Sequence, residues 1–188
     1  LGTSTTLGSA TVNADLIADT KTLTVTGSEG LTLTSKEGVI DASAYAGAIA
    51  ATVVNTTDTT LKIGTAANTI THKGDTDAKT LTIDASAGGG TAGTLTIADG
   101  TSVQGELTIT GLENNLMIND DFKGTGALSV TTAASDGKTI ALGTSTTLGS
   151  ATVNADLIAD TKTLTVTGSE GLTLTSKEGV IDASAYAG

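Results

Sequence analysis

Few side chains in this sequence could carry out chemistry, and the acidic clusters are the strongest candidates. Asn119, Asp120 and Asp121 are consecutive, and Asp75 and Asp77 flank a single residue. Oxygen-bearing side chains suit calcium, but the ion needs about six to eight oxygen ligands. Adjacent residues of a strand point to opposite faces, so only a turn could bring these oxygens together. Two interpretations stay open, a solvated acidic corner and a calcium site, and we assign no metal ligand.

A glycine-rich stretch matches a cofactor-binding motif in the wrong context. Gly88, Gly90 and Gly93 fit the dinucleotide pattern Gly-x-Gly-x-x-Gly. That pattern needs a helix after it, so that the pyrophosphate can lie on the helix N-terminus. Residues 94–97 read Thr-Leu-Thr-Ile, which is typical of a strand. We therefore interpret the glycines as a corner and expect no bound cofactor.

The remaining candidates are isolated. Ser135 and Lys138 have the spacing of an acylating serine enzyme, but the Asp-Gly between them predicts a turn instead of a helix. His72 is the only histidine, and we expect it in a solvated polar loop. Residues 55–57 form a glycosylation pattern, which chance explains in so threonine-rich a chain. We predict no catalytic residue and no enzyme activity.

Composition excludes several classes of protein. The 188 residues include no Cys, Pro or Trp, 41 Thr and 24 Gly, and the net charge is −11. The absence of Cys excludes disulfide scaffolds. An acidic chain without Arg and with 2% aromatic residues is a poor nucleic-acid binder. No apolar run is long enough to span a membrane, and nothing points to a small-molecule substrate.

An internal duplication dominates the sequence. Residues 1–47 and 142–188 are identical, which gives a repeat of 141 residues. We therefore expect residues 1–141 to be one complete repeat and 142–188 the first third of the next, cut from a longer tandem array. Arrays of identical units are typical of spacers, filaments and lattices.

Short alternating segments predict an all-β fold. Runs such as 31–34, 81–84, 95–97 and 128–131 place Leu, Ile or Val on one face and Thr on the other, and start about 8 to 14 residues apart. Small aliphatic side chains favour a β-solenoid, or β-helix, over the alternative of tandem β-sandwiches, whose cores usually hold large aromatics. Coils of two strands and of three both fit the spacing. Alanine-rich residues 10–18 and 41–51 leave short helices open.

These phrases carry a resemblance to known proteins. Leu-Thr-Val-Thr-Gly at 23–27, Leu-Thr-Leu-Thr at 31–34 and the Asp-Ala-Ser of 41–43 resemble the Thr/Ala/Gly-rich repeats of bacterial surface-layer proteins and giant secreted adhesins. The calcium nonapeptide of repeats-in-toxin proteins is absent. The resemblance implies an extracellular or cell-surface structural protein that assembles with identical repeats or chains into a filament, surface layer or adhesin stalk.

Threonine spacing allows a second function. Thr22, Thr24 and Thr26, and likewise Thr32 and Thr34, would point outward from one face of a strand. Ice-binding solenoids have a similar composition and present such pairs at one fixed position in every coil. The alternative prediction is therefore an ice- or surface-binding β-solenoid that uses outward threonines.

Overall fold

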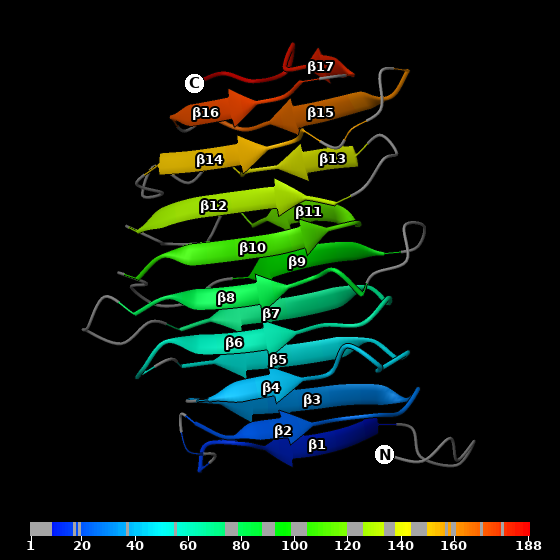
Figure 1. Cartoon of the computed structure of the whole chain (residues 1–188), viewed down its shortest axis with the longest axis vertical. Coiled ribbons are helices and arrows are strands. Elements are labelled where there is room, and N and C mark those ends of the chain that lie inside the picture. The colour runs from blue at the N-terminus through cyan, green and yellow to red at the C-terminus, as the bar shows by residue number, and fades with distance from the viewer. Residues whose placement is uncertain are drawn as a thin grey trace.

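The computed structural model shows a parallel β-solenoid, and the part of the chain that it describes contains no helix (Figure 1). The described residues are 9–16, 18, 20–36, 38–54, 56–73, 79–87, 93–98, 105–119, 126–133, 138–143, 150–156, 158, 161–169, 171–177 and 179–188. The predicted solenoid is confirmed, and tandem sandwiches are excluded because every strand pairing is parallel. In their described residues, the two segments that could have been helical form strands and corners instead.

Two sheets form the walls of the solenoid. The odd-numbered sheet holds β1 (Ser9–Asn13), β3 (Gly30–Ser35), β5 (Ile49–Val53), β7 (Asn68–His72), β9 (Thr94–Ala98), β11 (Asn115–Ile118), β13 (Lys138–Ala141), β15 (Thr163–Thr167) and β17 (Val180–Asp182). The even-numbered sheet holds β2 (Thr22–Thr24), β4 (Val39–Asp41), β6 (Thr59–Lys62), β8 (Leu81–Asp84), β10 (Leu107–Leu112), β12 (Ala127–Thr132), β14 (Ser150–Asn154) and β16 (Leu172–Thr175). Consecutive strands alternate between the sheets, so each coil has two strands.

Corners absorb the differences in coil length. Residues that pair in neighbouring strands are as few as 17 apart, as for Thr22 and Val39, and as many as 27 apart, as for Asn68 and Leu95. The strands nevertheless stack in two unbroken sheets from one end of the solenoid to the other (Figure 1). Insertions of several residues at a corner therefore leave the two walls intact.

Aliphatic columns inside the solenoid form its core. In the even-numbered sheet one inward position is apolar in all eight strands, and each residue pairs with the next: Leu23, Ile40, Leu61, Ile83, Ile109, Val130, Val153 and Leu174. Six of these side chains, Ile40 to Val153, are buried. Period-two alternation explains the pattern, because it sends the Leu, Ile and Val residues at every second position of a strand inward. The narrow interior explains why the chain needs almost no aromatic residues.

One polar side chain within the core, Asn68, has compensating hydrogen bonds. Asn68 lies in the inward column of the odd-numbered sheet; its amide donates to the carbonyl oxygens of Gly64 (3.2 Å) and Ala66 (2.8 Å), and its Oδ1 accepts from the backbone N–H of Ile49 at 3.0 Å.

His72, at the end of β7, is also buried, with 0% of its surface exposed. The expectation that His72 lies in a solvated loop is therefore wrong, because it occupies an inward position next to Val53 of β5.

The strand ladder continues between the two identical segments. β14 pairs with β12 and β15 pairs with β13, so residues of the second copy stack directly on those that precede it. Apolar residues pair across the junction: Leu128 pairs with Ala151, Val130 with Val153, and Ile140 with Val166. The stacking gives one continuous core, without a boundary between separate globular units.

Candidate functional site: the outer face of the even-numbered sheet

The outer face of the even-numbered sheet carries an aligned column of hydroxyl groups, which we call the hydroxyl column. Its members pair in sequence on six neighbouring strands: Thr60, Thr82, Thr108, Ser129, Thr152 and Thr173. Thr60 lies between Thr59 and Leu61, whereas the other five each lie between two inward-facing apolar residues. All six are half-buried or exposed. Neighbouring strands lie about 4.8 Å apart, which sets the spacing of the hydroxyls along the solenoid axis.

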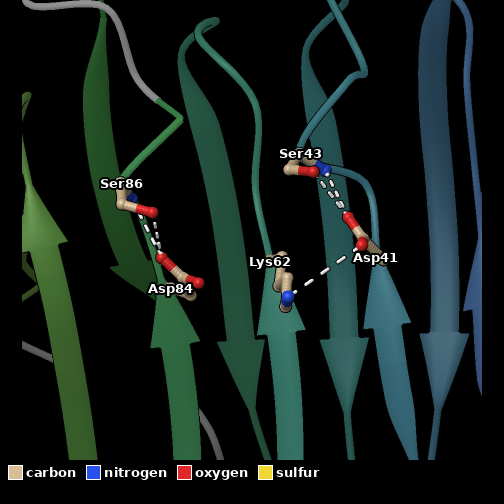
Figure 2. A network of polar contacts seen from close by, with 5 residues as sticks. All are labelled: Asp41, Ser43, Lys62, Asp84 and Ser86. Carbon is tan, nitrogen blue, oxygen red and sulfur yellow. Dashed lines mark hydrogen bonds and ion pairs between the residues drawn. The ribbon is translucent and has the colours of Figure 1, made fainter.

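A second outward column beside it divides the face into two parts. On β4, β6 and β8 this column holds Asp41, Lys62 and Asp84, which pair in register. Lys62 Nζ lies 4.0 Å from Asp41 Oδ2, and Figure 2 shows Lys62 between the two aspartates. An exposed ion pair of this kind contributes little stability. Farther along the stack the second column is uncharged: it holds Thr131, Asn154 and Thr175 on β12, β14 and β16.

The Asp-Ala-Ser elements terminate strands at the corners. Ser43 donates to Asp41 Oδ1 through its Oγ (2.6 Å) and its backbone N–H (3.1 Å), and Ser86 bonds Asp84 in the same way, at 2.6 and 3.1 Å (Figure 2). The Ser43 bonds, with a smaller effect of Lys62, lower the pKa of the Asp41 carboxyl. A side chain that bonds the backbone two residues on forms a local turn. These acids therefore shape corners.

The middle alanine of each element completes the corner from inside. Ala42 and Ala85 are buried, and their N–H groups donate to Lys62 O (3.0 Å) and Thr110 O (2.9 Å) of the next coil. Asn13-Ala-Asp15 repeats the arrangement, with Asn13 Oδ1 accepting from the N–H of Asp15 at 2.9 Å. An Asx residue, a small inward residue and a polar residue thus form the same type of corner at these three places.

A glycine lets two corners approach closely. Gly111 has φ +63°, and a Cβ there would lie 2.6 Å from Ser86 Cβ and 2.9 Å from Ser86 Cα. A side chain would clash and would also strain the left-handed backbone. The pairing register of β10 and β12 shifts around this residue, between Ile109 and Leu112. The absence of a side chain at Gly111 therefore lets β10 pack closely on the Asp84–Ser86 corner.

Most members of the candidate chemical groups lie outside the part of the chain that the structure describes. Asn119 follows β11 and extends the ladder by donating its N–H to Ile97 O at 2.9 Å. Its partners in the suggested calcium site, Asp120 and Asp121, lie outside the described residues, as do Asp75 and Asp77. Within the described part of the chain, no three His, Cys, Asp or Glu side chains form a group that could hold a metal ion.

The two enzyme-like motifs also lack their required context. Gly93 leads directly into β9, a strand and not a helix, while Gly88 and Gly90 lie outside the described residues. Lys138 opens β13, and Ser135 lies outside the described residues. Thr56 and Thr57 follow β5, with Asn55 outside the described residues. As in the sequence, neither motif is followed by a helix.

A shallow depression on the odd-numbered sheet has no charged residue in its lining. It has a volume of about 400 Å³ and is lined by Met117, Ile118, Asn119, Ala141, Gly143, Thr167, Gly168, Ser169, Ala185 and Ala187. None of these residues has an ionisable side chain, so the lining includes no carboxylate, imidazole or amine that could act as a general acid or base. Small residues at successive outward positions, such as Ala141 next to Met117, account for its shape.

Sequence reasoning missed the hydroxyl column itself. The threonine pairs noted in the sequence lie on different sheets, Thr22 and Thr24 on β2 and Thr32 and Thr34 on β3. The column runs elsewhere, through Thr60 to Thr173, and Val39 ends it at β4. Irregular spacing along the chain hid it, because alignment depends on how the corners are folded.

Protein-family models, curated proteins and solved structures all give no match to the chain. In the described part of the chain, no helix has the length and apolar character needed to cross a membrane.

Proposed function

We propose that the chain is a structural β-solenoid, part of an extracellular filament, surface layer or adhesin stalk in which identical repeats stack edge to edge. The observation that carries the proposal is the continuous ladder between the two identical segments, in which β14 packs on β12 and β15 on β13. Each further repeat would thereby lengthen the solenoid along its axis.

The mechanical element would be the pair of parallel ladders. Each strand within the stack bonds a neighbour on both sides, and the apolar column from Leu23 to Leu174 runs through the stack. The charge of −11 favours solubility and discourages sideways pairing of sheets. We propose no enzymatic role. The surface location rests on the resemblance to surface-layer and adhesin repeats.

Electron microscopy of chains with increasing numbers of repeats tests this function. Thirteen strands, β1 to β13, precede β14, the first strand of the second copy. At two strands per coil they make six and a half coils, which predicts about 31 Å of added length per 141 residues. Straight rods that lengthen by this amount are the expected result. Compact particles, or separate globules joined by flexible segments, would contradict it.

A second function, binding of ice or another regular surface, is favoured by the hydroxyl column. On β12 and β16 the outward pairs are Ser129 with Thr131 and Thr173 with Thr175, free of charged neighbours in the two columns. Alternate residues of a strand lie about 6.6 Å apart, so the pairs form a two-dimensional lattice with the 4.8 Å strand spacing.

Ice recrystallisation and thermal hysteresis measurements separate this function from the first. If the column binds ice, the Thr152→Tyr variant should lose inhibition, while Thr69→Tyr on the other sheet should keep it. The absence of any effect of the unaltered chain on ice growth would exclude ice as the ligand.

A further inference from the structure

The two copies of the repeated segment lie on opposite walls of the solenoid. Ser9–Asn13 forms β1 in the odd-numbered sheet, whereas the identical Ser150–Asn154 forms β14 in the even-numbered sheet. β2, β3 and β4 change sheets in the same way when they recur as β15, β16 and β17. In Figure 1 the arrows of β1 and β14 accordingly point in opposite directions.

Local structure is nevertheless the same in both copies. Gly27 bridges Tyr45, and Gly168 bridges Tyr186. The carboxylates of Asp41 and Asp182 accept the same pair of hydrogen bonds, at 3.1 and 2.6 Å and at 3.0 and 2.7 Å. The second copy is therefore the first copy turned by half a revolution, because an odd number of strands separates them in a coil of two strands.

The edge formed by β16 and β17 is chemically the surface that β3 and β4 present inside the stack. β3 and β4 are covered by β5 and β6: Leu31 pairs with Ile49, Leu33 with Ala51, and Ile40 with Leu61. In the second copy these apolar residues line the outermost strands, and Ile181 is 37% exposed where Ile40 is 0% exposed. An open ladder with an apolar strip is a template for another strand.

We propose that the β16–β17 edge is the docking surface for the segment that repeats residues 48–63 in the next part of an array, and that stacking there sets each further copy half a turn from the one before. The inference rests on the proposed stacking function. The partner is named by its sequence, because residues 48–63 already cover an identical surface at β3 and β4.

The N-terminal edge of a second chain is the wrong partner for this surface. β14 and β15 repeat β1 and β2, and they stack on β12 and β13. The β1–β2 edge therefore fits β12 and β13, not β16 and β17. Stacking is specific, since each edge has one complementary segment within the repeat.

Half-turn stacking determines which wall of the solenoid carries a given surface feature in each repeat of an array. A feature on one wall of a repeat, such as the hydroxyl column, would appear on the opposite wall in the next repeat. It would return to the first wall only after two repeats, about 62 Å along the axis, since two repeats make thirteen coils. Both faces of an array would then present the same chemistry, which suits contacts with partners on two sides.

Binding of labelled peptides to the full chain tests the docking surface. A peptide of residues 48–63 should bind saturably, and a peptide of residues 9–24 should not. Ile181→Lys, and Leu174→Asp where the chain stays folded by circular dichroism, should weaken binding at least tenfold, and the outward Thr173→Asp much less. Equal binding of both peptides, or binding of neither, would overturn the proposal.

Spin-label distances test the half turn, since the chain has no cysteine. Labels at Thr32 and Thr173 mark the same position in the two copies, and labels at Thr32 and Thr167 mark one outward column of the odd-numbered sheet. The first distance should exceed the second by several ångströms, because it crosses both sheets. Distances equal to within about half a coil, ~2.4 Å, would overturn the half turn.

The two proposals fail separately. Rods that lengthen with repeat number but do not bind the 48–63 peptide would contradict the docking surface and support the structural function. Peptide binding by a chain whose longer arrays form no rods would contradict the structural function and support the docking surface.

Discussion

Burial of His72 makes this residue sensitive to pH. The side chain is inward-facing at the end of β7, and loss of solvent lowers its pKa from 6.5 to about 4. The unfolded chain therefore binds a proton more readily than the folded chain between these values. Stability is fully present above pH 6.5 and falls as the pH drops toward 4, by about 3 kcal/mol in total.

Chemical denaturation as a function of pH measures this effect. The His72→Leu variant should lose most of the decline between pH 6.5 and 4, because it has no proton to bind. Asp41→Asn should retain it. The pKa of Asp41 is lowered from 3.8, so its own contribution to stability is present above pH 3.8 and is lost only as the pH falls below that value. An unchanged decline in the His72→Leu variant would show that other groups cause it.

The Asp84–Ser86 corner predicts a stability effect without a ligand. Asp84→Ala removes both hydrogen bonds at this corner and should destabilise the chain by about 1 kcal/mol, the usual value for such a bond. Asp84→Asn keeps an acceptor oxygen and should cost less. Thr82→Ala on the outer face of the same strand is the matched control, with an expected change within about 0.5 kcal/mol. A calcium-dependent difference among these variants would argue for a ligand role instead.

At the scale of the strand, the inward column should carry most of the stability. Ile83 lies at the centre of the column, is fully buried, and pairs with Leu61 and Ile109. Ile83→Ala leaves a cavity between coils and should cost about 2 to 5 kcal/mol. Thermal or urea unfolding measures it against Thr82→Ala. Similar losses for both variants would indicate that burial does not distinguish the two faces.

The whole molecule is held by backbone ladders and aliphatic packing, so metal removal should not unfold it. The expected circular dichroism spectrum is the same with and without a chelator. Loss of the β-signal on chelation would contradict this prediction, and it would make Asp120 and Asp121 the first candidates for metal ligands.

The sequence by itself determined the fold class and the direction of the side chains. Alternation in segments such as 81–84 and 107–110 sends Leu and Ile inward and Thr outward, and the shortage of large side chains leaves only a narrow core. Neither the number of strands per coil nor the burial of His72 followed from it, because both depend on which corner closes which coil.

Only the tertiary structure decided which residues align across strands. Coils that differ in length from 17 to 27 residues still place Thr60, Thr82 and Thr108 in one column, because the aliphatic columns within set the register and the corners absorb the difference. The half turn between identical segments has the same origin. It depends on the odd number of strands in 141 residues, and a strand is counted only when its neighbours in space are known.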